Sequence, residues 1–193
     1  MNSTGLREHS QLVRLLAETS YREGQFTLSS GVSSDFYLDV KQATYSPKGA
    51  RLVGRAMVDL LSEYHVEAVG GLTMGADAVV SATVLTSEHS GRPIHGFVVR
   101  KEAKKHGLSK WIEGVLPKGR VAIVDDVVTT GKSILRAVQQ VREAGAEVVL
   151  VACVVDREEG GRAELERRDL HFVPLCTISE IRAVVSQTVE EAQ

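Results

Sequence analysis

The chain of 193 residues has the length of one domain and can bury a substantial hydrophobic core. Its 23 lysine and arginine residues nearly balance its 25 aspartate and glutamate residues, so the formal net charge is −2. This balance argues against nucleic acid or an anionic membrane as a partner, and it requires any basic patch to be local. We therefore expect a single domain over residues 1–193.

Two cysteines, Cys153 and Cys176, stand in apolar stretches and lack the spacing of metal ligands. Such residues are typical of buried free thiols in a reducing compartment. The N-terminus has no apolar run of the kind found in signal peptides, and no stretch approaches the roughly 18 apolar residues of a membrane span. We expect a cytoplasmic protein that does not contact membranes.

The N-terminal region combines a helix with a small β element. Leucines at helical spacing predict a helix over about 8–19. Two strand-like runs at 25–28 and 36–40 are separated by a serine-rich turn. They predict a small β element outside the main sheet.

From residue 46 onward, helices and strands alternate. Ser46 and Pro47 are a typical N-cap and first residue of a helix, and an apolar stripe at helical spacing follows them. Short apolar strands are predicted at 66–71 and 94–99, with a helix over 76–87 between them. This alternation predicts an α/β fold with a mostly parallel central sheet that helices cover on both faces.

Residues 100–116 interrupt the alternation, because they are polar, contain two glycines and lack a sustained period. A connection of this length inside a domain is usually functional or disordered. The pattern then resumes with a strand from Val121, a helix that ends near Gly145, a nearly continuous apolar strand over 148–155, a polar helix, a strand through Phe172 and a final helix from about 178.

The most informative stretch is VAIVDDVVTTGKS, from Val121 to Ser133. An apolar strand runs into two adjacent carboxylates, Asp125 and Asp126, and a hydroxyl-rich turn then leads into a helix. Open α/β sheets bind ligands at the carboxyl ends of their strands. Free amides and the positive end of the helix dipole make the turn at 129–133 suitable for a phosphate monoester.

The end of this stretch also matches the end of a P-loop. A P-loop, however, needs glycine five residues before Gly131, where this chain has Asp126, and a carboxylate there would repel the phosphates of a nucleotide. A ribose 5-phosphate suits the stretch better, because its hydroxyls can donate to the carboxylates while its phosphate binds the turn. The alternative is a pair of carboxylates that only caps the end of a strand.

Basic residues gather in the interrupting segment, where Glu102 is the only acid among Arg100, Lys101, Lys104, Lys105 and His106. Such a segment is commonly a solvated surface loop. Its length and its position after the carboxyl end of a strand also allow it to close over the site like a lid. Cations that reach a pyrophosphate would then stabilise the charge of a departing group, most strongly where water is excluded.

VAIVDDVVTTGKS resembles the signature with which type I phosphoribosyltransferases bind phosphoribosyl pyrophosphate (PRPP). Two more segments, FTLSSG from Phe26 and VRKEAKKHG from Val99, resemble those of orotate phosphoribosyltransferases. The resemblance extends over nearly the whole chain, with its motifs in the family's order. It implies a type I phosphoribosyltransferase fold with a small N-terminal β hood, contributed mainly by residues 20–45, and a mobile loop at about 100–114.

The resemblance implies an enzyme of de novo pyrimidine (UMP) biosynthesis. Members of the family transfer the 5-phosphoribosyl group of PRPP to N1 of orotate, which gives orotidine 5′-monophosphate and pyrophosphate. The resemblance also implies Mg²⁺ bound mainly through PRPP, and the sequence, which has no dense set of carboxylates, names no direct metal ligand. In the family, the lysines and histidine of the loop reach a neighbouring subunit's site, which implies a homodimer with shared active sites.

Carried over by position, the resemblance implies three groups of site residues. Those with a catalytic role are Lys101, Lys104, His106, Asp125 and Asp126. Those that bind PRPP are the same five together with Arg100, Val127, Val128, Thr129, Thr130, Gly131, Lys132 and Ser133. Those that bind orotate are Thr129, Arg157, Tyr37 and Leu38. Arg157 would pair with the orotate carboxylate, and a surface salt bridge with Glu158 or Glu159 is its alternative role.

The chain departs from the family pattern at two places. Ser29 stands where some members have a lysine that reaches PRPP, and Thr73 and Met74 stand where others have a Tyr-Lys pair. Both departures change how charge balances the phosphates. Lys41 is a candidate to compensate for the first.

Two alternative functions stay open at this point. A phosphoribosyltransferase for another base would keep the carboxylates and the TTG turn but has no evident need for the RKEAKKHG loop. A non-catalytic PRPP-sensing regulator would usually add a DNA-binding segment or a basic face. The region before Phe26 is too short for a separate DNA-binding domain, and the sequence indicates no basic face outside the loop.

Overall fold

The computed structural model describes residues 3–27, 33–102 and 111–191. Its elements, in chain order, are α1 (Ser3–Thr19), β1 (Tyr21–Thr27), β2 (Ser33–Leu38), α2 (Lys41–Thr44), α3 (Pro47–Ser62), β3 (Ala68–Leu72), α4 (Asp77–Glu88), β4 (His95–Val99), β5 (Ile112–Gly114), β6 (Arg120–Val128), α5 (Lys132–Glu143), β7 (Glu147–Asp156), α6 (Gly161–Glu166), β8 (Phe172–Thr177) and α7 (Ile178–Glu191).

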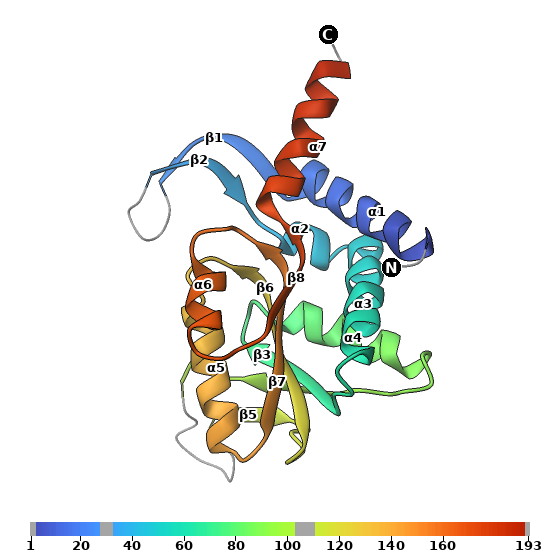
Figure 1. Cartoon of the computed structure of the whole chain (residues 1–193). Helices are drawn as coiled ribbons and strands as arrows, with labels where there is room; N and C mark the ends of the chain where they lie inside the picture. The colour runs from blue at the N-terminus through green and yellow to red at the C-terminus, as the bar shows by residue number, and fades with distance from the viewer. Residues whose placement is uncertain (1–2, 28–32, 103–110, 192–193) are drawn as a thin grey trace.

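The central sheet has six strands in the order β5-β4-β3-β6-β7-β8. Every neighbouring pair is parallel except β4 and β5, which pair antiparallel at one edge. Figure 1 shows α5 and α6 on one side of this sheet and α1, α3 and α4 on the other. The predicted α/β fold with a mostly parallel sheet is confirmed.

Side-chain alternation along the strands divides the core into two layers. On β6, Val121 and Ile123 belong to the layer that packs under α5, whereas Ala122 and Val124 belong to the layer under α1 and α3. Successive residues of a strand point to opposite faces, so a strand that is covered on both sides must be apolar throughout. This is why the strand before the carboxylate pair has no polar residue after Arg120.

The order of the strands creates a crevice between β3 and β6. The chain leaves β3 through α4 toward β4, and it leaves β6 through α5 toward β7, so the two connections run in opposite directions along the sheet. At such a switch point the loops that follow neighbouring strands separate, and ligands bind outside the carboxyl ends. The fold therefore places the ends of β3 and β6 at the predicted site.

The N-terminal hairpin of β1 and β2 forms a separate antiparallel sheet. Figure 1 shows it beyond the end of the central sheet at which β8 leads into α7, which is the carboxyl edge of the parallel strands. The rings of Tyr21 and Phe36 stack with their centroids 5.6 Å apart, and both residues are buried. The predicted β element outside the main sheet is confirmed.

Some boundaries differ from those predicted. The first helix begins at Ser3 instead of about 8, and it carries Leu6 on an exposed face where no core contact marks the pattern. The short helix α2 and the three-residue strand β5 were not predicted, because neither is long enough to show a period. The strand β6 extends to Val128 because its pairing with β7 continues to Asp156, so both carboxylates lie within the strand and not after it.

Two further predictions concern helix capping and thiols. Ser46 accepts a hydrogen bond from the Gly49 amide at 3.0 Å, and Pro47 is the first residue of α3, as predicted. Cys153 and Cys176 are buried free thiols, which confirms the prediction for both. Over the described ranges, no helix has the length and apolar character that crossing a bilayer requires.

Candidate active site

The site is built around the adjacent carboxylates of β6. Asp125 and Asp126 are both 6% exposed, in a strand whose other residues are apolar apart from Arg120. The Asp126 amide donates to Asp125 Oδ1 at 2.9 Å, and the Val127 amide donates to Asp126 Oδ1 at 2.9 Å. These backbone bonds fix the direction in which both carboxylates point.

The turn after β3 lies directly against this pair. A Cβ atom added to Gly75 would come within 2.2 Å of Asp125 Oδ1 and 2.8 Å of Asp126 Oδ1, so a larger residue here would displace the carboxylates. Thr73 donates from Oγ1 to Asp77 at 2.8 Å, which joins the turn to the start of α4. The crevice between β3 and β6 is therefore lined by backbone on one side and by carboxylates on the other.

Lys41, the first residue of α2, neutralises one of the two charges. Its Nζ lies 2.5 Å from Asp126 Oδ2, and its backbone amide donates to Asp39 at 3.2 Å. Burial opposes the charge of this ammonium group, but the hydrogen bond and the charge of Asp126 outweigh burial and raise the pKa of Lys41. Lys41 therefore stays protonated while it spans from the hairpin side of the molecule to β6.

Asp125 has no cation in contact comparable to that of Asp126. Burial, followed by the neighbouring charge of Asp126, raises the pKa of Asp125 to about 8. A carboxyl group with this pKa is mostly protonated at neutral pH, so it can donate a hydrogen bond as well as accept one. The pair thus offers both hydrogen-bonding directions to a ligand with hydroxyl groups.

The turn at Thr129–Ser133 connects β6 to α5. Gly131 is the N-cap of α5 and has φ +79°, a left-handed conformation that favours glycine. The helix is anchored by its buried face, which consists of Ile134, Ala137, Val138 and Val141. Thr130, Lys132 and Ser133 are exposed, so the free amides of the first helical turn open toward solvent, as a phosphate site requires.

Arg157 follows β7 and is buried, with 9% of its surface exposed. Its Nη2 lies 2.7 Å from Glu159 Oε1, but this ion pair lacks the geometry of a hydrogen bond. Among the described residues, Nε and Nη2 have no hydrogen-bond partner, although both atoms are buried. Buried donors without acceptors are costly and commonly mark a site whose acceptor is a ligand. The adjoining Glu158 instead accepts from the amide of Ser179.

The hairpin holds this arginine through an aromatic ring. The Arg157 Cζ lies 4.5 Å from the centroid of the Phe36 ring, and the Arg182 Cζ of α7 lies 4.6 Å from the same centroid. Arg182 also pairs with Asp35 at 2.9 Å. Tyr37 is 45% exposed and packs against Phe26, so the side chain predicted to line the base site faces outward in the ligand-free chain.

The basic segment is described only at its two ends. The backbone amide of Arg100 donates a hydrogen bond to the Trp111 carbonyl at 2.8 Å, and the Nη1 of Arg100 lies 3.3 Å from Glu113 Oε1. Arg136 of α5 donates to the carbonyl of Lys101, which is itself exposed. The pairing of β4 with β5 thus holds both ends of the segment beside α5. Lys104, Lys105 and His106 lie outside the described residues.

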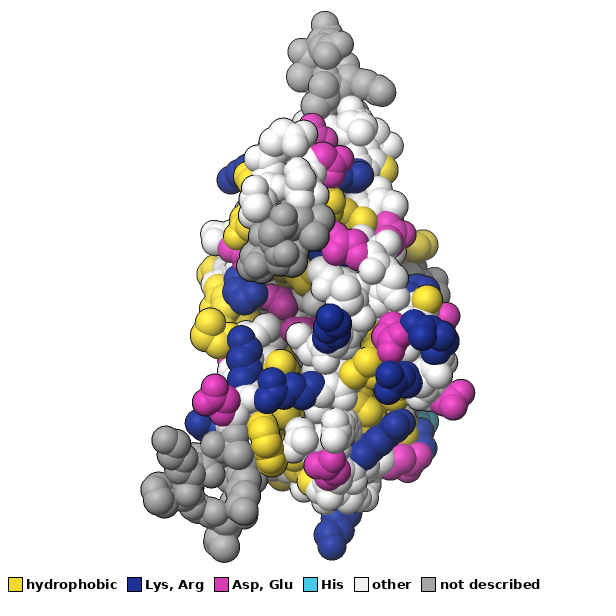
Figure 2. All heavy atoms as spheres, turned by 90° about the vertical axis from the view of Figure 1, so that its left-hand side faces the viewer, with side chains coloured by type: hydrophobic (Ala, Val, Ile, Leu, Met, Phe, Trp, Pro, Cys, Tyr) yellow, Lys and Arg dark blue, Asp and Glu magenta, His cyan; other side chains and the backbone are white. Residues whose placement is uncertain are grey.

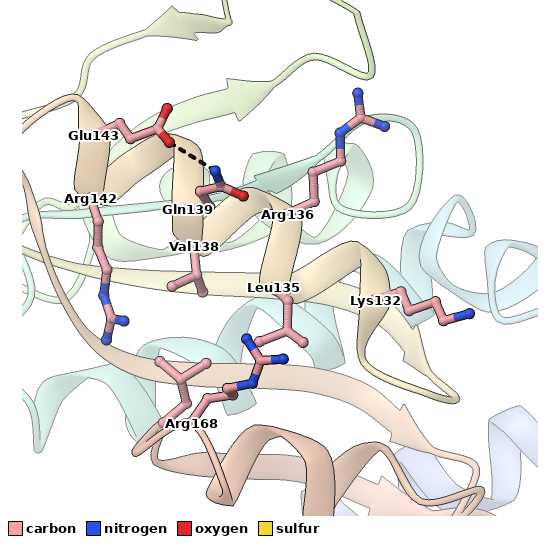
Figure 3. Close-up of a pocket in the computed structure, with 9 residues that line it drawn as sticks. Lys132, Leu135, Arg136, Val138, Gln139, Arg142, Glu143 and Arg168 are labelled. Atoms are coloured by element: carbon pink, nitrogen blue, oxygen red, sulfur yellow. Dashed lines mark hydrogen bonds between the residues drawn. The ribbon is translucent and has the colours of Figure 1, made fainter.

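A hollow of about 630 Å³ lies between α5 and the turn after α6. Figure 3 shows Lys132 at the start of α5 pointing away from Arg142, while the guanidinium of Arg168 lies between them, beside Leu135. Figure 2 shows lysine and arginine side chains spread over this face of the molecule. The prediction that no basic face exists outside the loop is therefore wrong. The helical period of α5 brings together cations that are separated in the sequence.

The donor set has limited capacity for a metal. Over residues 3–27, 33–102 and 111–191, no three His, Cys, Asp or Glu side chains gather closely enough to hold an ion. Mg²⁺ prefers oxygen ligands and usually keeps several waters or substrate oxygens. Two carboxylates at the crevice suit an ion that arrives on an anionic substrate.

Sequence reasoning did not find several of these partners. The role of Gly75 depends on β3 and β6 being neighbours, and the two arginines on Phe36 belong to segments far apart in the chain. Of these partners, only Lys41 is indicated by the sequence, because it stands just after the second strand of the hairpin. The contacts themselves follow from strand order, which the sequence pattern does not specify.

Comparisons with known proteins identify relatives that match about nine-tenths of the chain. Residues 40–173 match the model of the phosphoribosyl transferase domain. An orotate phosphoribosyltransferase of Aquifex aeolicus is 47% identical over 178 residues, which cover 90% of this chain and 97% of that protein. The crystal structure of an orotate phosphoribosyltransferase from Mycobacterium tuberculosis is 40% identical, with a TM-score of 0.81 and coverage of 90% of this chain and 98% of that one. A structure of the same enzyme with PRPP has a TM-score of 0.76 at 36% identity, with the same coverage.

The raised pKa of Asp125 predicts a pH-dependent stability. Between about pH 4 and pH 8 the folded chain holds a proton on Asp125 that the unfolded chain releases, so this contribution to stability is lost as the pH rises. Asp125→Asn should therefore raise the free energy of unfolding at pH 8 by roughly 1–3 kcal/mol and have little effect near pH 4. Urea unfolding at several pH values measures this difference.

Asp59→Asn is the matched control, because Asp59 is exposed on α3. It should leave the pH dependence unchanged. An equal loss of stability between pH 5 and pH 8 in the parent and in Asp125→Asn would contradict the assignment of the proton to Asp125.

Proposed function

The chain belongs to the phosphoribosyltransferase family, and we propose that within it the protein is an orotate phosphoribosyltransferase. It transfers the 5-phosphoribosyl group of PRPP to N1 of orotate and produces orotidine 5′-monophosphate and pyrophosphate, a step of de novo UMP biosynthesis. The observation that carries this proposal is the buried arginine with unpaired donors, Arg157, at the same sheet edge as the carboxylate pair. The similarity to enzymes of this name covers about nine-tenths of the chain.

Each part of PRPP has a suitable group of residues at the carboxyl edge of the sheet. The 5′-phosphate binds the amides and hydroxyls of Thr129–Ser133, at the positive end of the α5 dipole. The ribose hydroxyls bind Asp125 and Asp126, one of which is ion-paired and the other of which has a raised pKa. Val127 and Val128 supply the backbone between these two subsites.

Orotate binds between Arg157 and the hairpin. Its carboxylate replaces that of Glu159 and satisfies the donors of Arg157, as guanidinium and carboxylate pair well in two-point contacts. Thr129 offers a second polar contact. Tyr37 and Leu38 of β2 supply a wall for the pyrimidine ring, and this requires the exposed Tyr37 ring to turn toward the ligand.

Pyrophosphate departs toward the basic loop. The bond between C1 of the ribose and the pyrophosphate oxygen breaks, with its electron pair going to the pyrophosphate, while positive charge develops on the ribose ring. The bond between C1 and N1 of orotate forms, and the N1 proton leaves with the pyrophosphate. Arg100, Lys101, Lys104 and His106 stabilise the growing negative charge of the leaving group once the loop excludes water. Mg²⁺ would be held mainly by PRPP itself and would supply further positive charge to the pyrophosphate.

Positioning carries most of the catalysis. The fold sets three parts of the site before a ligand binds. They are the hydrogen bonds from backbone amides to Asp125 and Asp126, the backbone of Gly75 and the start of α5. Arg100 is not positioned in advance, because its guanidinium lies 3.3 Å from Glu113 and must be released to reach pyrophosphate. Loop closure therefore includes the exchange of this ion pair.

The proposal also includes assembly and location. The chain acts as one phosphoribosyltransferase domain, in which residues 20–45 form a hood and residues 100–114 close over the site. It forms a homodimer in which the loop of one subunit serves the site of the other. Its two buried free thiols support a reducing, cytoplasmic location.

A phosphoribosyltransferase for another base and a PRPP-sensing regulator are the competing functions. A different base without a carboxylate would leave the Arg157 donors unpaired, which argues against the first. The basic face on α5 is compatible with a regulator, but the relatives that match nearly the whole chain are named as enzymes. Both observations favour the orotate enzyme.

The base dependence of pyrophosphate release tests the function. With Mg²⁺ and PRPP, the purified protein should release pyrophosphate and consume orotate, and the loss of orotate absorbance should match the pyrophosphate formed. Hypoxanthine, adenine and uracil serve as comparison bases. Turnover of one of these without loss of orotate would contradict the assignment, and binding of PRPP without turnover of any base would favour the regulator.

Arg157→Ala should raise the KM for orotate about tenfold to a hundredfold, because a charged hydrogen-bonding partner of the carboxylate is lost. Arg157→Lys should recover only part of this loss, since lysine cannot make the two-point contact. Binding of PRPP in the absence of orotate should stay within about threefold of the parent. Steady-state kinetics and calorimetry measure the two quantities.

Arg167→Ala is the control for this series, because Arg167 is an exposed arginine near the end of α6 that pairs with Glu164. Its kinetics should match those of the parent. An unchanged KM for orotate in Arg157→Ala would contradict the assigned role.

Subunit sharing predicts complementation between two inactive chains. One chain carries Lys104→Ala, and the other carries Asp125→Asn with Asp126→Asn. Mixed and allowed to exchange subunits, they should regain up to about a quarter of the parent activity, because hybrid dimers contain one intact composite site. A mixture no more active than its two components would argue against loop exchange.

A further inference from the structure

Both oxygens of Asp126 have partners within the chain. Oδ1 accepts from the Val127 amide at 2.9 Å, and Oδ2 lies 2.5 Å from the Nζ of Lys41. The backbone bond is part of β6 and stays in place. A sugar hydroxyl that donates to Asp126 must therefore compete with Lys41 for Oδ2.

Lys41 is able to leave this position. Its side chain is 41% exposed, whereas that of Asp126 is 9% exposed, so the open side of the ion pair is the lysine side. An ammonium group on a four-carbon stem can move several ångströms without a change in the backbone. The backbone amide of Lys41 donates a hydrogen bond to the Asp39 side chain, which holds the backbone in place. The movement is therefore confined to the Lys41 side chain.

The crevice needs a cation at this point. The turn that faces the carboxylate pair consists of Thr73, Met74 and Gly75, none of which carries a charge. Within residues 3–27, 33–102 and 111–191, the carboxylate pair forms one ion pair, which joins Asp126 to Lys41. In PRPP the pyrophosphate is attached to C1, next to the C2 hydroxyl. When a ribose hydroxyl displaces Lys41 from Asp126, the ammonium group can therefore reach the pyrophosphate by a movement of its side chain alone.

We propose that Lys41 is a PRPP-binding residue that exchanges Asp126 for the pyrophosphate when the sugar enters the site. The inference rests on the proposed function and adds a residue from α2 to the PRPP site. In this exchange Asp126 receives a ribose hydroxyl and the ammonium receives a phosphate oxygen. After the exchange the buried carboxylate of Asp126 and the partly exposed ammonium of Lys41 each have a partner again, which keeps the cost of the exchange low.

Binding of PRPP to lysine variants tests the exchange directly. Lys41→Gln removes the charge but keeps a donor for Asp126, which protects the fold, and Lys41→Met removes both. Calorimetry with PRPP and Mg²⁺, without orotate, should show binding weakened by about tenfold to a hundredfold in both variants. Lys41→Arg keeps the charge and should bind within about threefold of the parent. Lys48→Met, at an exposed lysine of α3, is the matched control and should bind like the parent.

The opposite result identifies the competing role. If Lys41 only neutralises Asp126, its removal frees Oδ2 for the sugar, and PRPP binding in Lys41→Gln stays equal or becomes tighter. Either result would overturn the inference while the parent still binds PRPP and turns over orotate. Absence of PRPP binding in the parent would instead overturn the proposed function, and the inference with it. Denaturant unfolding of each variant confirms that the chains compared are folded.

Discussion

Two like charges in adjacent positions of one buried strand are the constraint on which the site depends. Asp125 and Asp126 are both nearly buried, and two ionised carboxylates so close together are costly unless one is neutralised. The structure resolves this cost in two ways: Lys41 pairs with Asp126, and the pKa of Asp125 rises to about 8. Apart from Arg120, the other residues of the strand are apolar, and burial among them is what makes two ionised carboxylates costly here.

The same principle extends across the site. In the ligand-free chain Asp126 pairs with Lys41, Arg157 with Glu159, and Arg100 with Glu113. Each pair holds a predicted ligand-binding charge beside an internal partner of opposite sign, in the place where part of a substrate would bind. Under the proposed function, binding would exchange ion pairs and not create them, so the affinity would measure the difference between internal and substrate partners.

The sequence could predict those parts of the site that are contiguous. The carboxylate pair, the turn at Thr129–Ser133 and Arg157 all follow buried strands, and their order identifies the edge of the sheet at which they meet. The contact between Lys41 and Asp126 joins positions 85 residues apart, and the stacking of Arg157 and Arg182 on Phe36 joins three separate elements. Such contacts depend on the placement of the hairpin over the sheet, which hydrophobic periodicity does not encode. The basic face of α5 was missed for a similar reason, because only the helical turn brings its cations together.

The antiparallel pairing of β5 with β4 limits how far the basic segment can extend. Val99 and Ile112 are paired neighbours, so the described chain on the two sides of the basic segment is held together at the edge of the sheet. Any twelve residues that begin and end at one point reach at most about 20 Å from it, because an extended residue spans roughly 3.4 Å. Any phosphate served by Lys104 or His106 must lie within that radius. In a dimer with shared sites, the partner's crevice must therefore approach the β4–β5 edge closely, and this edge becomes a geometric requirement on the assembly.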